Sequence, residues 1–199
     1  MASLFVVTHA LLYEYPNAHP ASAPMEMPLL YVDRAMPILP WTFLVYVSDY
    51  LIGIIALILV RDPEDFQEFV RTAFFTLVIC GIIFFFCPTI YPRPEYPQSS
   101  IWLFEYTMHL VRTLDSPTNC FPSLHVALTS VCAWALRKQG KLVSGVAIVW
   151  SAAIFVSTLT TKQHYLLDVV GGSAIAFSVI ALDHLLYRRN YLRFLAFRK

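Results

Sequence analysis

The feature that most constrains this chain is a series of apolar runs, each near the length of a membrane-spanning helix. A helix rises 1.5 Å per residue, so about 20 apolar residues cross a hydrocarbon core of about 30 Å. Five runs approach this length, at residues 38–60, 72–90, 122–136, 142–161 and 165–187. The third is short, since its residues reach only about 22 Å. We therefore predict an all-α fold, a polytopic transmembrane helical bundle of five spans.

The composition supports a membrane protein with one domain. Of the 199 residues, 58% are hydrophobic and 14% are charged, whereas soluble domains average about 25% charged residues. The net charge of +1 gives no sign of a nucleic-acid partner. We expect a single integral-membrane catalytic domain over residues 1–199, of which 1–37 form an irregular or interfacial N-terminal segment. The apolar stretch 3–13 is too short to span comfortably.

Basic residues set the expected orientation, because cytoplasmic loops carry an excess of lysine and arginine. Ten basic residues fall on the side of the 61–71 loop, the 137–141 loop and the C-terminal tail, against four on the other side. We expect 188–199 to be a basic cytoplasmic tail. The segments 91–121 and 158–163 then face the periplasm, a lumen or the cell exterior.

Three polar clusters share this outward side of the predicted bundle. They are Arg93 after the second run, Ser123 and His125 at the start of the third, and Lys162, His164 and Asp168 at the start of the fifth. Each cluster alone has an ordinary explanation as interfacial polar residues. Their convergence on one membrane face favours a functional site.

The residue types in these clusters suit phosphoryl transfer without a metal ion. His164 and Asp168 are four residues apart and meet on one helical face, so the carboxylate can orient the imidazole as a nucleophile. His125 can act as an acid. Arg93 and Lys162 can neutralise phosphate oxygens.

The start of the third run is expected to add an anion site. Pro122 fits the first turn of a helix, which places Ser123 and His125 at its N-terminus. Backbone N–H groups and the helix dipole favour an anion there.

These residues resemble the type 2 phosphatidic acid phosphatase superfamily of membrane lipid phosphatases and phosphotransferases. That family carries the motifs K-x6-R-P, P-S-G-H and S-R-x5-H-x3-D. Here the second motif reads Pro122-Ser123-Leu124-His125, the third keeps Ser157, His164 and Asp168, and the first survives as Arg93-Pro94. The resemblance covers roughly residues 31–187. It implies a helical fold, usually of six spans, and no metal or other cofactor.

The resemblance also implies roles for the matching residues. His164 would form a phosphohistidine, Asp168 would orient it, and His125 would protonate the leaving lipid alkoxide. Ser123 and Arg93 would bind phosphate oxygens. A lipid phosphate is the implied substrate; neither its identity nor the oligomeric state follows from the sequence.

The motifs depart from the family pattern at three positions. Phe86, Leu124 and Thr158 stand where the family has lysine, glycine and arginine. Lys162 is our candidate to replace one missing charge. The leucine and the stretch 31–50 resemble the branch of inositol phosphorylceramide synthases, which transfer a phospho-headgroup to an alcohol.

Several alternatives stay open from the sequence. One is a lipid phosphotransferase that shares the first half-reaction. Another is a metal enzyme, with His125, His164 and Asp168 as a 2-His-1-carboxylate set. A third is a non-enzymatic membrane protein. Asp49, inside the first run, is a further functional candidate because intramembrane carboxylates are expensive, and residues 102–114 suit an amphipathic interfacial helix.

Overall fold

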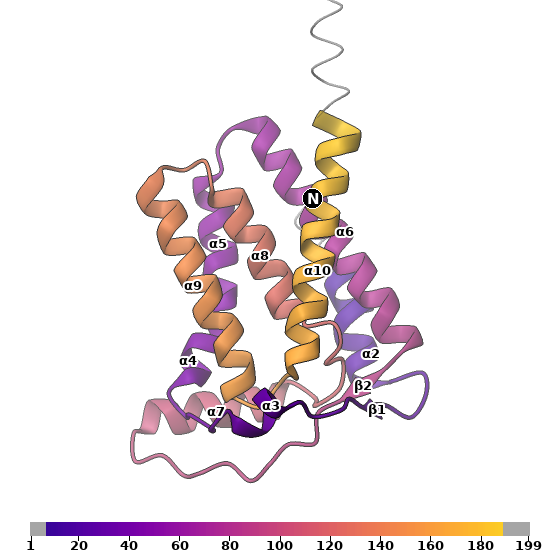
Figure 1. The fold of residues 1–199 in the computed structure, drawn as a ribbon, viewed down its shortest axis with the longest axis vertical. Coiled ribbons are helices and arrows are strands. Elements are labelled where there is room, and N and C mark those ends of the chain that lie inside the picture. The colour runs from indigo at the N-terminus through magenta and orange to yellow at the C-terminus, as the bar shows by residue number, and fades with distance from the viewer. Residues whose placement is uncertain (1–6, 189–199) are drawn as a thin grey trace, which may run out of the picture.

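The computed structural model describes residues 7–188 and is almost entirely helical (Figure 1), which confirms the all-α class. The elements in chain order are η1 (Ala10–Glu14), α2 (Tyr15–Ala18), β1 (Met25–Glu26), α3 (Tyr31–Ala35), α4 (Thr42–Val47), α5 (Asp49–Leu59), α6 (Pro63–Phe86), β2 (Thr89–Ile90), α7 (Trp102–Leu114), α8 (Leu124–Leu136), α9 (Lys141–Thr160), α10 (Leu166–Asp183) and η2 (His184–Arg188). The predicted tail beyond residue 188 lies outside the described residues, as does the start of the apolar stretch 3–13.

Within residues 7–188, four helical segments are long and apolar enough to cross a membrane: Thr42–Leu59, Pro63–Phe86, Lys141–Thr160 and Leu166–Tyr187. They correspond to four of the five predicted spans. The remaining predicted span, the run 122–136, forms α8, which has 13 residues and is about 20 Å long.

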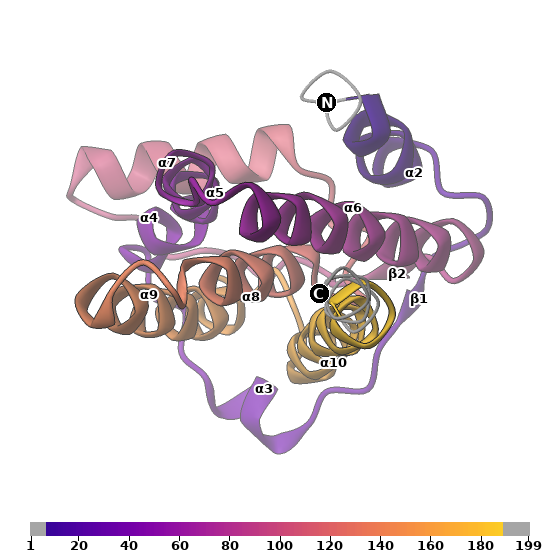
Figure 2. The same ribbon diagram turned by 90° about the horizontal axis from the view of Figure 1, so that it is seen from above.

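The short helix α8 occupies the centre of the bundle. It packs against α5, α6, α9 and α10, and the view from above shows it between them (Figure 2). Nine of its residues are buried. Because neighbouring helices surround α8, it does not need the length that a lipid-facing span requires.

The first predicted span, 38–60, is broken in the structure. α4 ends and α5 begins at Ser48, whose hydroxyl donates to the carbonyl of Val45. Trp150 on α9 donates its indole N–H to the same hydroxyl oxygen at 2.7 Å. Asp49 is the first residue of α5, although α4 and α5 together form the one apolar segment Thr42–Leu59.

The second predicted span, 72–90, is shifted in the structure. α6 starts nine residues earlier, where the Asp62 side chain accepts from the N–H groups of Glu64 and Asp65 at 3.0 Å each. Capping and helix-favouring acidic residues extend the helix beyond its apolar part. Residues 89–90 instead form β2, which pairs in parallel with β1 in the register Met25↔Thr89.

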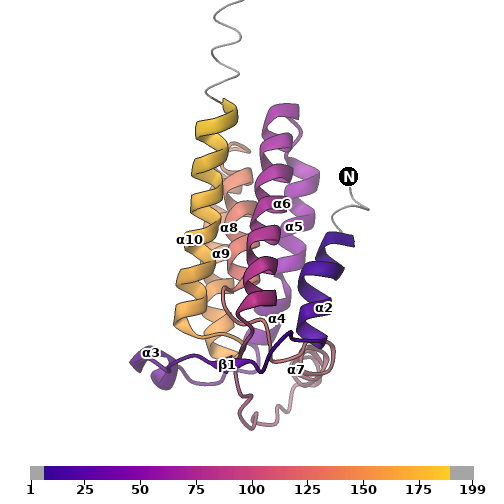
Figure 3. The ribbon, with the colours of Figure 1, turned by 90° about the vertical axis from the view of Figure 1, so that its right-hand side faces the viewer.

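The connections at one end of the bundle are structured (Figures 1 and 3). α7 has the predicted boundaries and lies across that end (Figure 1). The described part of the segment 1–37, predicted to be irregular or interfacial, contains η1, α2, β1 and α3. The N-terminal helical turns pack on α6, where Leu12 lies against Gly81 so closely that a Cβ there would overlap it.

The opposite end of the bundle is held by ion pairs. Arg71 on α6 makes two hydrogen bonds to Asp183 on α10, at 2.7 and 3.0 Å. Lys138 contacts the carboxylate of Asp65 at 2.6 Å. These pairs join helices that are far apart in the chain and lie away from the polar clusters of interest.

Candidate active site

The turn between α9 and α10 positions His164. The N–H groups of Gln163 and His164 both donate to the carbonyl of Thr158, at 3.1 and 3.3 Å. α10 then starts with a capping interaction, in which Asp168 Oδ2 accepts from the N–H of Tyr165 at 2.8 Å. His164 is buried at the base of α10, 6% exposed.

The hydrogen bonds of His164 show which ring nitrogen donates. Its Nδ1 lies 3.0 Å from the carbonyl oxygen of Cys120 and 3.3 Å from Asp168 Oδ2. A carbonyl oxygen only accepts, so Nδ1 carries a proton and donates it to these two oxygens. Among the described residues Nε2 has no hydrogen-bond partner. His164 and Asp168 meet as predicted, while the Cys120 carbonyl is a partner that no side-chain pattern reveals.

The loop before α8 packs directly on α10. The backbone N–H of Ser123 donates to the carbonyl of Asp168 at 3.0 Å. Gly172 faces the carbonyl of Ser123, and a Cβ at this position would overlap that oxygen. This contact holds the start of α8 beside the start of α10, so two of the three predicted clusters meet.

Ser123 is the N-cap of α8, and its hydroxyl oxygen accepts from the N–H of Val126 at 3.4 Å. Pro122 therefore precedes the cap and is not in the first turn, which corrects the prediction. Within residues 7–188 the N–H groups of Leu124 and His125 have no acceptor. Such unpaired donors are what an anion-binding helix N-terminus requires; that an anion binds here stays a prediction.

His125 lies beside His164. The two ring centroids are 5.7 Å apart, with the planes inclined at 65°. Unlike His164, His125 is bonded at both nitrogens: Nδ1 is 2.6 Å from Asp49 Oδ2, and Nε2 is 2.6 Å from the hydroxyl of Tyr46. Asp49 and Tyr46 come from α5 and α4, so the broken first span contributes directly to the site.

Arg93 approaches the site from the 91–121 segment. Its guanidinium donates to the carbonyls of Arg112 and Asp115, at 2.9 and 2.6 Å, and to the side-chain oxygen of Gln163 at 3.3 Å. Its Nε is buried without a hydrogen-bond partner in the structure. Through this contact with Gln163, the Arg93 cluster reaches the residue next to His164 in the chain.

Lys162 is held on another side of the turn. Its ammonium donates to the backbone carbonyl of Asp33 at 2.6 Å, and its backbone has a positive φ of 53°. Burial lowers the pKa of Lys162, and the nearby Asp33 carboxylate opposes this. No described hydrogen bond joins Lys162 to Arg93, His125 or His164.

An acidic residue that the sequence analysis missed lies near both histidines. The Asp115 carboxylate accepts from the hydroxyl of Tyr13 at 3.1 Å, and burial raises the pKa of Asp115. The Asn17 side chain makes hydrogen bonds to the backbone of Ser116 and Thr118 in the same loop. The sequence gives no signal for these contacts, because the partners are about 100 residues apart.

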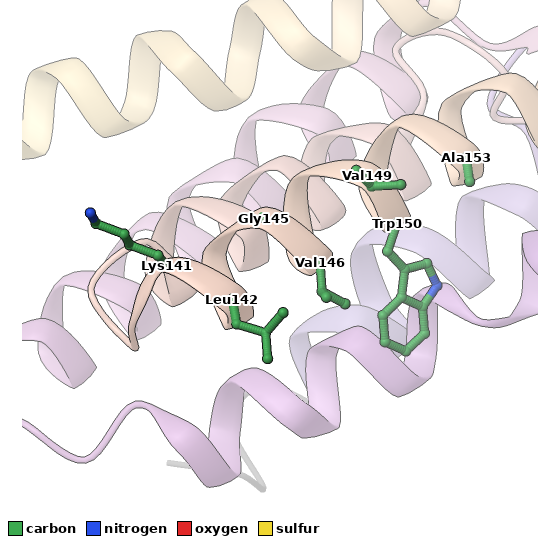
Figure 4. A pocket seen from close by; sticks show the side chains of 7 residues that line it. All are labelled: Lys141, Leu142, Gly145, Val146, Val149, Trp150 and Ala153. Carbon is green, nitrogen blue, oxygen red and sulfur yellow. The ribbon is translucent and has the colours of Figure 1, made fainter.

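An apolar cavity of about 450 Å³ extends from the site into the bundle. His125, Asp49 and Tyr13 lie on its wall, together with apolar side chains of α5, α6 and α8 that include Leu57 and Phe66. A second hollow lies on the outside of α9, where Leu142, Val146 and Trp150 project from one side of the helix (Figure 4). It contains none of the candidate site residues.

The possible metal ligands differ from the predicted 2-His-1-carboxylate set. The ligand atoms that converge within 4.8 Å belong to Cys120, His164 and Asp168. His125 is bonded elsewhere. The Cys120 thiol donates to two carbonyls, and burial raises its pKa. Each of these three side chains already has hydrogen-bond partners within the protein.

Comparison with known proteins places the chain in a family. A family model described as the PAP2 superfamily matches residues 29–182. No curated protein and no solved structure gives a match. The matched region contains all three polar clusters, including His125 and His164, three of the four candidate spans and most of the fourth, Leu166–Tyr187. Because this match covers more than half of the chain, the chain belongs to the PAP2 superfamily, which supports phosphatase-type chemistry in general.

Proposed function

We propose that this protein hydrolyses a lipid phosphate or diphosphate ester without a metal ion, through a phosphohistidine at His164. The observation that carries the proposal is the difference between two adjacent histidines. His164 donates through Nδ1, and its Nε2 has no hydrogen-bond partner among the described residues. His125, 5.7 Å away between ring centroids, has a carboxylate on Nδ1. One ring is prepared as a nucleophile and the other as an acid.

The reaction then has two balanced steps. Nε2 of His164 attacks phosphorus and forms an N–P bond, while the bond from phosphorus to the lipid oxygen breaks. That oxygen takes a proton from His125 and leaves as the lipid alcohol. Water next attacks phosphorus, gives a proton to His125, and releases phosphate and neutral His164. Asp168 stabilises the positive charge on the His164 ring during transfer.

The phosphate oxygens need positive partners near His164. Arg93 supplies the best supported one, because its Nε is buried and unbonded and its guanidinium contacts Gln163. The start of α8 at Ser123 adds the free N–H groups of Leu124 and His125. Lys162 adds positive charge without contacting the phosphate, since its ammonium donates to the backbone carbonyl of Asp33.

The apolar cavity supports a lipid as the substrate. It begins at His125 and Asp49 and continues between α5, α6 and α8. A hydrocarbon chain placed there leaves its ester oxygen beside His125, the proposed acid. A small water-soluble ester would gain nothing from these walls.

The span pattern supports an orientation for the proposed single catalytic domain. The site lies at the end of the bundle that holds α3 and α7 (Figure 1), and the opposite end carries Arg71, Arg137 and Lys138. By the positive-inside rule that opposite end is cytoplasmic. We propose that the C-terminus lies there and that the site faces the periplasm, a lumen or the exterior.

The proposal is tested by phosphate release from purified protein in detergent, with a panel of lipid monophosphates and diphosphates and excess EDTA. We expect release in EDTA, and rapid acid-free quenching of a ³²P-labelled substrate should trap an acid-labile, base-stable phosphoprotein. Release only after a divalent ion is added back would contradict metal-independent hydrolysis.

A lipid phosphotransferase is the second candidate, favoured by Leu124 at the glycine position of the second motif. It shares the first step. It would form the phosphoprotein in EDTA but release free phosphate slowly until an acceptor alcohol is supplied.

A further inference from the structure

Asp49 is a carboxylate for which neither the family motifs nor the proposed mechanism has a role. Its Oδ2 lies 2.6 Å from Nδ1 of His125, and its Oδ1 accepts from the N–H of Tyr50 at 2.7 Å. The Asp49 and His125 side chains are 13% and 10% exposed. A pair this close and this buried is a strong, charge-assisted hydrogen bond.

The second nitrogen of His125 also has a fixed partner. The Tyr46 hydroxyl lies 2.6 Å from Nε2, and the two rings are 4.4 Å apart between centroids. Tyr46 is 3% exposed and packs with Phe43. A phenol can accept a proton from Nε2 while it donates its own, so its net charge need not change.

The backbone explains why this arrangement exists. α4 and α5 are separate helices because the chain breaks at Ser48, and the break is fixed by Trp150. Tyr46 and Asp49 are three residues apart on either side of Ser48, a spacing that places both side chains on one face of this segment, and both reach His125.

We infer that Asp49, His125 and Tyr46 form a proton-delivery chain for the leaving lipid oxygen. This inference rests on the proposed function. Asp49 is the positioning residue: its carboxylate holds Nδ1–H, so the transferable proton is on Nε2. As the phosphorus–oxygen bond breaks, the Tyr46 hydroxyl gives its proton to the lipid oxygen. It takes the Nε2 proton of His125 in the same step, which leaves His125 neutral and Tyr46 unchanged.

The test compares two substrates with apolar groups of similar length and different leaving groups, n-dodecyl phosphate and 4-octylphenyl phosphate. An alkoxide needs a proton to leave, whereas a phenoxide, with a phenol pKa of about 10, needs it far less. Asp49→Asn keeps the size of the side chain and an oxygen for Nδ1–H but removes the charge. We expect kcat on dodecyl phosphate to fall about 10²-fold and kcat on the aryl ester to fall less than about tenfold.

Two further variants complete the design. Tyr46→Phe should reproduce the same dependence on the leaving group. Asp65→Asn, which removes a carboxylate paired with Lys138 at the other end of α6, is the matched control and should leave the ratio of the two rates unchanged. Thermal unfolding of each variant in the same detergent reports folding, and Asp49→Glu tests whether a carboxylate at this position restores the alkyl rate.

The outcomes separate the two proposals. Equal losses on both substrates for Asp49→Asn, or no loss on dodecyl phosphate, would overturn the role of Asp49 in proton delivery. A Tyr46→Phe variant with an unchanged rate ratio would remove Tyr46 from the chain. If the wild-type protein forms neither phosphate nor a phosphoprotein from either ester, the proposed function fails, and this inference with it.

Discussion

The two histidines of the site have carboxylate partners of very different origin. His164 and Asp168 are four residues apart, at the start of one helix. His125 and Asp49 are 76 residues apart and come from α8 and α5. The local pair is longer, 3.3 Å against 2.6 Å, and shares its Nδ1–H with a backbone carbonyl. Proximity in sequence therefore does not identify the tighter pair.

The surroundings of the two pairs differ as well. His164 lies among loops, next to Gln163 and the Cys120 carbonyl. His125 lies on the wall of the apolar cavity. This division suits an enzyme that holds phosphate at one ring and the lipid ester oxygen at the other.

The largest effect is expected from His164→Gln. Without the nucleophilic nitrogen no phosphohistidine can form, so the rate should fall by on the order of 10⁴-fold or more on alkyl and aryl esters alike. Phosphate release and ³²P trapping measure this directly. A folded variant that still forms the phosphoprotein would assign the nucleophile to another residue.

Asp168→Asn should have a smaller effect, about 10²-fold on kcat. The variant loses the charge that stabilises the imidazolium, but the Cys120 carbonyl still holds Nδ1–H in the same tautomer. Steady-state kinetics with both esters should show equal losses, in contrast to Asp49→Asn. Full retained activity would show that Asp168 only caps α10.

Gly53→Phe tests whether the apolar cavity beside His125 binds the lipid tail. Gly53 lines the cavity, and a Cβ added there meets no atom within 4 Å, so the ring can enter the space without disturbing the helix. The ring takes the room of about two methylenes of the lipid tail. We therefore expect kcat/KM for long-chain relative to short-chain lipid phosphates to fall about tenfold.

Gly145→Phe on α9 is the control for this variant, because its Cβ is equally unobstructed and lies in the outer hollow. An equal loss for all chain lengths in Gly53→Phe would argue against the cavity as the binding site of the tail.

The smallest effect is expected from Lys162→Met, which keeps the length of the side chain but removes the charge. Its ammonium is bonded to the carbonyl of Asp33, so we expect only about a threefold rise in KM for the lipid phosphate. Competition by inorganic phosphate measures the same site. A loss near 10²-fold, typical of a direct charge-assisted contact, would place Lys162 on the phosphate.

Much of this architecture was predictable because it depends on local pattern. Apolar runs predicted the spans, and the amphipathic pattern predicted α7 with its correct boundaries. The spacing of His164 and Asp168 predicted their contact. Boundaries failed where capping overrode hydropathy, as at Asp62 before α6.

The partners of the two histidines outside the His164–Asp168 pair were not predictable in the same way. Nothing in the sequence around Asp49 indicates that the first span breaks at Ser48, since that break depends on a hydrogen bond from Trp150. The partners of His125 follow from helix packing, and the second acceptor for His164 is a backbone group that any residue at position 120 would supply. Such contacts depend on tertiary structure alone.

The shortness of α8 has a consequence for where the chemistry takes place. α8 and α9 are joined by four residues, 137–140, so the C-terminal end of α8 lies level with the N-terminal end of α9. α8 is seven residues shorter than α9, so its N-terminal end stops about 10 Å short of the C-terminal end of α9. His125, at the start of α8, therefore lies about 10 Å further into the bundle than the corresponding end of α9. Under the proposed function, a lipid phosphate would react at this depth without leaving its leaflet, and water would have to travel inward to reach it.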